Sequence, residues 1–580
     1  MAEKIRSREE IAREDTWAME DLYASDAAWL EDLEKLKGLG AKLPEYAGKL
    51  SASAQTLLEY QKLGEEISVL LDSLANYAQR KSDEDTRNAV YQDLTGKLTK
   101  VWVQLGADTA FEVPELLSIS DEQMEKFYEE VPELSLYRRH FDSIRRKRAH
   151  VLSESEEKLL AMAGEMAGTP EEVYSLFADA DLTFRPALDA NGEEHQITQG
   201  SYIAAMESPD RTLRKNAFES LYAGFGAYKN TVAATLAGQV KQLEFFSKAR
   251  HYTSPLEASL DATEVPVSVY HELIEAVHQN MDKMHRYMRL RKKLLGVSEL
   301  HMYDLYTPLV AASEERIPFA EAKKTVAQAL GVMGERYGKI LQEGFQNRWI
   351  DVYENTGKRS GAYSAGARVH PYVLLNYTGT LDSEFTLAHE MGHAIHSYLS
   401  NKTQPIVYSD YVIFVAEVAS TCNEALLMQH LLKTTTDKKQ RAYLINHFLE
   451  QFRTTLYRQT MFAEFELKIA ELSAQGVTLT ADVLCEEYRK LNALYYGEDV
   501  VLDEEIALEW ARIPHFYYNY YVFQYATGYA AAIALSEGIL KDGEPAVERY
   551  LGFLSGGCSK SPIELLKGAG VDVTTAEPVN

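Results

Sequence analysis

Two histidines and a glutamate that could share one reaction stand in the segment His389-Glu390-Met391-Gly392-His393. Histidines four residues apart project from one face of a helix, where their imidazoles can bind a single metal ion. Glu390 lies about 100° further round such a helix, beside the metal rather than on it. There it can accept a proton from metal-bound water. The segment therefore predicts a metal-dependent hydrolase with Glu390 as general base.

The residues around this segment have the pattern of a buried helix. Gly392 is unfavourable in a helix interior by about 1 kcal/mol, so it indicates that another backbone approaches closely there. A core helix with hydrogen-bonded histidines is the structural alternative. The apolar positions recur at helical spacing without a proline, and they are Phe385, Leu387, Ala388, Met391, Ile395, Tyr398 and Leu399.

A catalytic zinc needs a third protein ligand and keeps a fourth position open. His396 follows His393 by only three residues, too few for the long histidine spacing of metzincins, so we expect it either to support a ligand from behind or to pack there. Residues 411–424 form an apolar helical pattern that carries Glu417 and Glu424 on one face. A carboxylate on such a helix is costly unless it is paired or coordinated. We predict Glu417 as the third ligand and Glu424 as acceptor of a ligating histidine's ring N–H.

Two alternatives at this helix stay open. The roles of Glu417 and Glu424 could be exchanged, because both carboxylates lie on the same face. Cys422 is expected to be a small buried residue, with ligation through its thiol as a lesser alternative.

A third cluster of polar groups lies in residues 513–529, which are rich in tyrosine and contain His515. Tyrosine and histidine side chains can donate hydrogen bonds to the oxyanion that develops when water attacks an amide carbonyl. The structural alternative is an aromatic core helix, because tyrosine packs well in protein interiors. The residues alone do not decide between these two.

Composition limits the classes of partner and compartment. The formal charge of −27 argues against nucleic acid, which requires clustered cationic surface. Three scattered cysteines give neither a disulfide framework nor a thiolate zinc site. The polar N-terminus is no signal peptide, and residues 521–540 contain Gln524 and Glu537, so a core helix is expected there rather than a membrane span. We expect a cytoplasmic protein without membrane or nucleic-acid partners.

The chain reads as mainly α-helical. Amphipathic helices are predicted over residues 27–177, with breaks near 82–85 and 112–114, and again over 202–345. Asn191-Gly192 predicts a hairpin between strands at 182–184 and 196–198. A soft domain boundary is placed near residue 200. Residues 371–377 read as a strand just before the histidine helix, where a free edge could pair with an extended peptide, although edge status is not visible in a sequence.

These motifs together resemble the thimet-oligopeptidase-like zinc metallopeptidases, most closely the oligoendopeptidase F branch. The resemblance covers nearly the whole chain and rests on five segments in the family's order. They are Asp15–Tyr23, Lys358–Tyr363, His389–His396, Glu417–Ser420 and His515 with the tyrosines after it.

The resemblance implies a multi-helical ellipsoid with a deep substrate channel and a small sheet beside the zinc helix. It implies an oligoendopeptidase F-like N-terminal domain (1–200) and a catalytic domain (201–580). One zinc per chain would be held by His389, His393 and Glu417, with Glu390 as base. His515 and Tyr520 would stabilise the transition state. Tyr525 and Tyr529 match the family's later tyrosines, at a spacing that differs by about one residue from that of the thimet branch. The expected substrate contacts are Gly361, Ala362, Tyr363 and Tyr518.

The sequence thus predicts a zinc-dependent oligoendopeptidase of peptide catabolism. It would hydrolyse internal bonds of short unstructured peptides with zinc-activated water and Glu390 as base. A zinc exopeptidase resembling a carboxypeptidase, and a non-catalytic peptide-binding scaffold, are the alternatives. The oligomeric state is not predicted.

Overall fold

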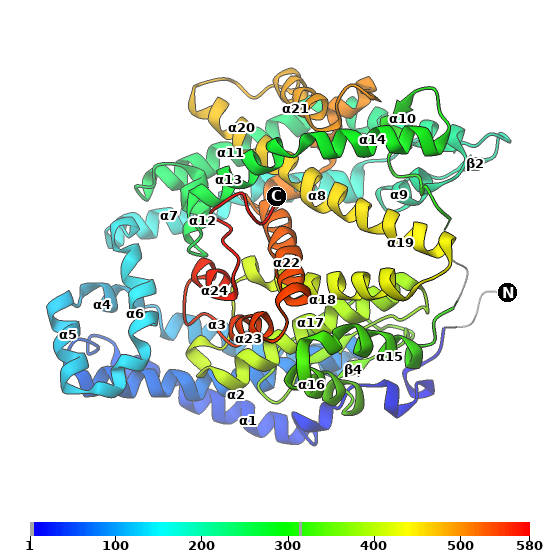
Figure 1. The fold of residues 1–580 in the computed structure, drawn as a ribbon. Coiled ribbons are helices and arrows are strands. Elements are labelled where there is room, and N and C mark those ends of the chain that lie inside the picture. Colours follow the sequence, from blue (N-terminus) through cyan, green and yellow to red (C-terminus); the bar gives the residue numbers. More distant parts are fainter. Residues whose placement is uncertain (1–4, 312–315) are drawn as a thin grey trace. The chain divides into compact units, whose positions relative to one another are not determined.

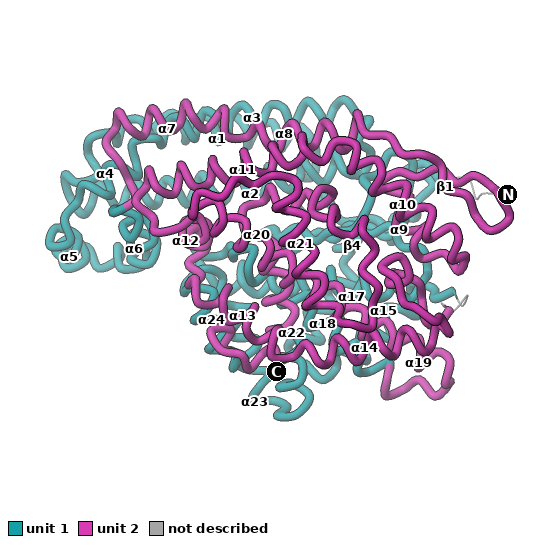
Figure 2. The backbone as a smooth tube through the Cα atoms, turned by 90° about the horizontal axis from the view of Figure 1, so that it is seen from above, with its two compact units in different colours: residues 1–149, 314–431, 532–571 teal, residues 150–313, 432–531, 572–580 magenta. Residues whose placement is uncertain are grey.

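The computed structural model describes residues 5–311 and 316–580, and the predicted mainly α-helical class is confirmed (Figure 1). Residues 1–4 of the polar N-terminal segment lie outside these ranges. The chain forms two compact units, each made of three segments that are separated in sequence (Figure 2). Unit 1 comprises residues 1–149, 314–431 and 532–571, and unit 2 comprises 150–313, 432–531 and 572–580. The domain boundary placed near residue 200 lies inside unit 2 and stays a prediction.

Unit 1 contains the histidine motif. Several of its helices begin at a serine or threonine whose side chain accepts a backbone N–H of the first turn, as Ser25, Ser53 and Thr380 do. The helices of unit 1 are α1 (Asp26–Gly40), α2 (Ala54–Glu84), α3 (Ala89–Asp108), α4 (Glu112–Ser118), α5 (Asp121–Glu130), α6 (Arg138–Arg145), α15 (Phe319–Ala329), α16 (Gly334–Gln346), α17 (Leu381–Thr403), α18 (Ile413–Thr434, to residue 431), the latter part of α22 (Phe523–Asp542), α23 (Glu544–Leu554) and α24 (Pro562–Ala569).

Unit 2 contains the tyrosine-rich segment, which leads from a 3-10 turn at Pro514–Tyr517 into the first half of α22. A parallel pair, β3 (Leu300–His301) and β7 (Val500–Val501), also lies here. The remaining helices of unit 2 are α7 (Glu154–Ala167), α8 (Thr169–Leu176), α9 (Gln199–Glu207), α10 (Arg211–Ala227), α11 (Lys229–Ala249), α12 (Pro255–Asp261), α13 (Val267–Gln279), α14 (Met281–Leu295), α19 (Lys438–Gln451), α20 (Arg458–Ala474) and α21 (Ala481–Tyr496).

The predicted hairpin is present but shorter than expected. Strands β1 (Ala187–Leu188) and β2 (Glu194–His195) pair antiparallel, closer to the turn than the segments predicted from sequence. Gly192 has φ +82°, as the Asn-Gly dipeptide indicated. Phe184, in the first predicted strand, packs instead against Gly224 and the ring of Phe225. Its apolar character thus serves helix packing and not the hairpin.

A three-stranded sheet lies against the histidine helix, as the family resemblance implied. Its order is β4 (Ile350–Asp351), β6 (Tyr372–Leu374), β5 (Tyr363–Ala365), with β4 parallel and β5 antiparallel to β6. The strand predicted at 371–377 is therefore the central strand β6. All three of its residues are buried, and both of its edges are paired. The hypothesis that this strand offers a free edge to a peptide is wrong, because the outer strands are β4 and β5.

The core of unit 1 joins the N-terminal segment to this sheet. Trp17 is 1% exposed, packs edge-on against Tyr372 of β6 and donates its indole N–H to Glu84 at 2.8 Å. Trp29 is fully buried and donates to the carbonyl of Leu74 at 2.9 Å. Burying these large aromatic side chains with their N–H groups bonded stabilises the unit.

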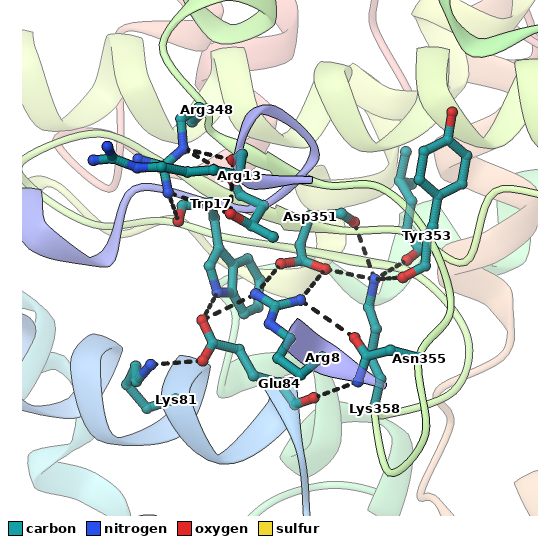
Figure 3. Close-up of polar contacts among 12 residues, drawn as sticks. Arg8, Arg13, Trp17, Lys81, Glu84, Arg348, Asp351, Tyr353, Asn355 and Lys358 are labelled. Carbon is teal, nitrogen blue, oxygen red and sulfur yellow. Dashed lines mark hydrogen bonds and ion pairs between the residues drawn. The ribbon is translucent and has the colours of Figure 1, made fainter. Parts of the chain in front are cut away.

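A buried ionic network fixes the loop before β5 (Figure 3). The Lys358 ammonium and the Asp351 carboxylate are both fully buried and lie 2.7 Å apart. Lys358 Nζ also donates to the carbonyls of Tyr353 at 2.7 Å and Leu375 at 2.6 Å. Asp351 accepts from Arg8 as well, and Arg8 also pairs with Glu84. Burial lowers the pKa of Lys358, and the Asp351 charge opposes that shift. Lys358 is thus a structural anchor of the sheet and its loop.

Replacing Lys358 by Met should strongly destabilise unit 1. Asp351 would keep a buried charge with one partner fewer, and breaking a buried pair costs about 3–5 kcal/mol. Urea denaturation at neutral pH would measure the loss. Lys37→Met is the matched control, since the Lys37–Glu34 pair is exposed and worth about 1 kcal/mol or less. Equal losses in the two variants would contradict the anchoring role.

No helix within residues 5–311 and 316–580 is both long enough and apolar enough to cross a membrane. Helix α22, the most apolar stretch of the sequence, instead buries Ala526, Ala530 and Ala531, as a core helix does.

Candidate metal centre

Helix α17 brings His389 and His393 to one side. Thr380 caps the helix by accepting the N–H of Ser383 at 3.2 Å, and Asp382 and Glu384 in the first turn favour its N-terminus. The two rings lie edge to face with centroids 4.8 Å apart. Their Nε2 atoms are separated by only 3.2 Å. The helical spacing thus places both imidazole nitrogens at one point.

Gly392 allows α18 to lie directly against α17. A Cβ atom at residue 392 would stand 2.6 Å from the Cα of Ser420 and 2.7 Å from the carbonyl oxygen of Ala419. The glycine thus accounts for the close backbone approach expected from the sequence. Asn423 reinforces the crossing by donating to the carbonyl of Ala388 at 3.0 Å and accepting from Tyr337 at 2.7 Å.

The close crossing places Glu417 beside the two histidines. Its Oε2 atom lies 3.5 Å from His389 Nε2 and 3.7 Å from His393 Nε2. The three ligand atoms lie within 4.8 Å of one another, and all three residues are partly exposed. Ser420 Oγ donates to Glu417 Oε2 at 3.2 Å and so helps to orient the carboxylate.

This geometry fits a tetrahedral zinc ion. Ligand atoms bound at about 2.0–2.1 Å to a tetrahedral ion lie roughly 3.3–3.4 Å apart. The observed separations of 3.2, 3.5 and 3.7 Å are close to that value without rearrangement. Two imidazoles and one carboxylate are also a donor set that catalytic zinc sites use. The residues present therefore suit zinc in both chemistry and spacing.

Glu424 contacts the opposite nitrogen of His389. Its Oε1 forms a hydrogen bond with His389 Nδ1, which fixes the ring so that Nε2, on its other side, faces Glu417. Burial lowers the pKa of His389, but the bond to Glu424 and the nearby carboxylates raise it to about 9. Burial and the charge on His389 lower the pKa of His393 to about 4. The geometry favours Glu417 over Glu424 as the third ligand.

Two other predicted residues have packing roles here. His396 is 1% exposed and stacks on Tyr411 with ring centroids 3.7 Å apart. Burial lowers its pKa to about 3, so it is neutral. Cys422 is fully buried, and burial raises the pKa of its thiol to about 12. A neutral buried thiol is a poor metal ligand, which disfavours the cysteine alternative.

Glu390 is buried beside the three ligand atoms, with 6% of its surface exposed. Its Oε2 has no hydrogen-bond partner among the described residues. Burial raises the pKa of Glu390 to about 7, with His389 opposing and Glu417 reinforcing the shift. A carboxylate with an available oxygen and a pKa near neutrality is suited to take and return a proton.

The loop before β5 and the first turn of α17 line one cavity of about 290 Å³. Gly361, Ala362 and Asp382 are among its lining residues. Asn376 fixes the loop by donating to the carbonyls of Arg359 at 3.0 Å and Gly361 at 2.8 Å. The hydroxyl of Tyr363 donates to Asp83 at 2.6 Å. Tyr363 therefore anchors the loop with its side chain. A contact between Tyr363 and a substrate would be made by its backbone.

The predicted residues of the tyrosine-rich segment lie in unit 2. His515 is half-buried, burial lowers its pKa, and its ring contacts those of Tyr518 and Tyr525 at 5.4 and 6.1 Å. Tyr518 is exposed, and Tyr529 is buried with its ring edge-on to Phe452 at 5.1 Å. Tyr520 is buried and has φ +59°.

Sequence reasoning assigned no role to Ser420, whose hydroxyl orients Glu417, or to Asn423, which joins the two helices. The signal was present, because both are polar residues on the same apolar helix that identified Glu417.

Comparisons with known proteins agree with this chemistry. Residues 204–580 match the model of peptidase family M3, and residues 115–184 match that of oligopeptidase F. The chain belongs to peptidase family M3. It is 48% identical over 579 residues to oligopeptidase PepF of Bacillus subtilis, covering all of this chain and 86% of that protein. An oligoendopeptidase F homolog of Lactococcus lactis is 42% identical, and the match covers 99% of this chain and 95% of that protein.

Solved structures give the same result for the fold. Oligoendopeptidase F of Enterococcus faecium superimposes with a TM-score of 0.73 at 38% identity, over 96% of both chains. A protein of Chlamydophila abortus superimposes with a TM-score of 0.93 at 36% identity, over 99% of this chain and 97% of the other. The predicted oligoendopeptidase F resemblance and the metalloendopeptidase class are confirmed. The role of each site residue stays a prediction, and the family is consistent with a metal.

Proposed function

We propose that this M3 peptidase is a zinc-dependent oligoendopeptidase that hydrolyses internal bonds of short unstructured peptides. One zinc ion per chain would be held by His389 Nε2, His393 Nε2 and a carboxylate oxygen of Glu417. The observation that carries the proposal is the convergence of these three atoms, with an unpartnered oxygen of Glu390 buried beside them.

The chain's own residues supply the proton transfers. When bound, zinc supplies Lewis-acid chemistry that makes water more acidic and the substrate carbonyl more electrophilic. Glu390 accepts the proton of the attacking water and then gives it to the leaving amine. Glu424 holds the proton of His389 on Nδ1, so that the ring keeps the tautomer that a ligand needs. His515, Tyr520, Tyr525 and Tyr529 are proposed to donate hydrogen bonds to the oxyanion.

The proposed substrate is an extended peptide held mainly through its backbone. The cavity beside Gly361 and Ala362 adjoins the first turn of the histidine helix, which supports a role for this loop in placing a peptide near the metal. Backbone pairing gives affinity without requiring a particular side chain. The absence of a disulfide among Cys422, Cys485 and Cys558 is compatible with the proposed cytoplasmic location.

Cleavage of a peptide blocked at both ends tests this function. We expect a single internal cut by the zinc-loaded enzyme, loss of the cut after treatment with a chelator, and recovery when zinc is restored. Mass spectrometry of the products gives the position of the cut. Removal of terminal residues only, from unblocked peptides only, would favour an exopeptidase. Binding without cleavage at stoichiometric zinc would favour a peptide-binding scaffold.

A further inference from the structure

Two consecutive residues at the centre of the tyrosine-rich segment have left-handed backbone conformations. Asn519 has φ +56° and Tyr520 has φ +59°. Residues with a Cβ atom rarely adopt this region, and a bulky side chain such as tyrosine does so less readily than asparagine. Such a conformation persists only where surrounding contacts hold it, and it commonly marks a functional site.

Side chains from three other helices of unit 2 hold this segment. Gln239 of α11 donates its amide hydrogens to the carbonyl of Tyr517 at 3.0 Å and to Asn519 Oδ1 at 2.7 Å. Ser259 of α12 donates to the carbonyl of Asn519 at 2.6 Å. Glu466 of α20 accepts the backbone N–H of Tyr520 at 3.1 Å. The last bond is the one that acts on Tyr520 itself.

Glu466 is an unusual residue to find in this position. It is 6% exposed, no cation pairs with it in the described chain, and its Oε2 has no partner there. An isolated buried carboxylate is costly, so a neutral acid is the favoured form. In agreement, burial raises the pKa of Glu466 to about 8, although the Tyr520 N–H opposes the shift. Gln239 and Glu466 both line a cavity of about 20 Å³, and Gln239 Oε1 is likewise without a partner among the described residues. The cavity has room for one water molecule, which needs roughly 10–15 Å³.

The side chain of Tyr520 is held at its ring and not at its hydroxyl. The ring packs edge-on against Tyr270, with centroids 5.9 Å apart. Among the described residues no hydrogen bond reaches the hydroxyl. A fixed ring with an uncommitted hydroxyl is what a hydrogen-bond donor to a reacting group requires.

We infer that Glu466, as a neutral carboxylic acid, is a positioning residue that holds Tyr520 in the left-handed conformation in which its hydroxyl serves the reaction. The inference rests on the proposed function, because it takes Tyr520 to be an oxyanion donor. Glu466 does not touch the substrate in this scheme, and it acts only through the backbone N–H of Tyr520.

Amide hydrogen exchange tests the clamp without reference to catalysis. In the zinc-loaded enzyme, Glu466→Leu should make peptides spanning residues 517–522 exchange at least about tenfold faster. Glu466→Gln keeps a neutral acceptor and should leave exchange unchanged. Glu464→Leu is the matched control, because Glu464 lies on the same helix and accepts instead from Tyr495 at 2.8 Å. Unchanged exchange in Glu466→Leu would overturn the inference, as would equal acceleration in the control.

A double-mutant cycle with Tyr520→Phe tests the positioning role. Glu466→Leu should lower kcat by about 10²-fold with KM within about twofold, and Glu466→Gln should restore kcat. In the Tyr520→Phe background, Glu466→Leu should lower kcat no further than about twofold, since the hydroxyl it positions is gone. Additive losses would show a general structural effect and overturn the inference.

The two proposals can fail separately. If Tyr520→Phe alone leaves kcat unchanged, the assignment of Tyr520 under the proposed function is wrong, and the positioning role of Glu466 fails with it. Faster exchange in Glu466→Leu would then show a clamp that has no catalytic purpose. If Tyr520→Phe lowers kcat but the cycle is additive, the proposed function stands and only the inference about Glu466 is wrong.

Discussion

Glu390→Gln is expected to lower kcat by about 10²–10⁴-fold while zinc stays bound at one equivalent per chain. Glutamine has the shape of glutamate and preserves the packing of α17, but it cannot accept the proton of the attacking water. His389, His393 and Glu417 are untouched, so metal content should not change. Steady-state kinetics on a blocked peptide, together with metal analysis of the same sample, measure both quantities.

A matched control for this variant lies on the same helix. Glu384 is 2% exposed, and burial raises its pKa to about 7, as it does for Glu390. It stands outside the cluster of ligand atoms, so Glu384→Gln should keep kcat within a few-fold of the native enzyme. A Glu390→Gln enzyme that retains kcat within about tenfold would show that another group is the base.

The comparison of the two carboxyls shows what a raised pKa can and cannot indicate. Desolvation is the largest cause of the raised pKa of both residues, so the shift by itself does not identify the base. Position distinguishes them, since Glu390 directly follows His389 and is coupled electrostatically to His389 and Glu417, and its Oε2 has no partner in the described chain.

The parts of the site that could be predicted from the sequence depend on local helix geometry. His389 and His393 are four residues apart, and helical periodicity alone places them together. Glu417 was found because a carboxylate on an apolar helix needs a compensating partner. Gly392 indicated the close approach of another backbone, because a glycine is unfavourable in a helix interior. In each case a single helix carries the information.

The parts that could not be predicted depend on pairings between segments far apart in the chain. Strand β6 was recognised, but its central position depends on its pairing with β5 and with β4, about 22 residues earlier. A buried strand of three residues has the same sequence pattern at the edge of a sheet as in its centre. The hydrogen-bond partner of the Tyr363 hydroxyl could not be predicted, because that partner, Asp83, is 280 residues away in the sequence. Likewise Glu466 is unremarkable in α20 until Tyr520 is placed beside it.

The two compact units illustrate the same limit at a larger scale. Each is assembled from three segments separated by other parts of the chain, and no shift in composition marks the points where the chain leaves one unit. The metal ligands fall in unit 1, and the proposed oxyanion donors fall in unit 2.

Replacing Glu417 or Glu424 by glutamine, one at a time, should show which carboxylate binds the metal and which one supports a ligating histidine. Glu417→Gln should lose most of its zinc and nearly all activity, because a neutral amide oxygen replaces a charged ligand atom that lies 3.5 and 3.7 Å from the histidine nitrogens. Glu424→Gln should weaken zinc binding by only about 10–100-fold, the usual consequence of losing the group that orients a ligating histidine.

Competition with a chromogenic chelator gives the zinc affinity of each variant, and activity is then measured at saturating zinc. Excess zinc should restore most of the activity of Glu424→Gln and little of that of Glu417→Gln. Glu384→Gln again serves as control, with native affinity expected. The opposite order, with Glu424→Gln unable to retain zinc and Glu417→Gln rescued by it, would exchange the two roles. The native structure argues against that outcome, since Glu424 already contacts the far nitrogen of His389 and cannot bind a metal at Nε2 without giving up that bond.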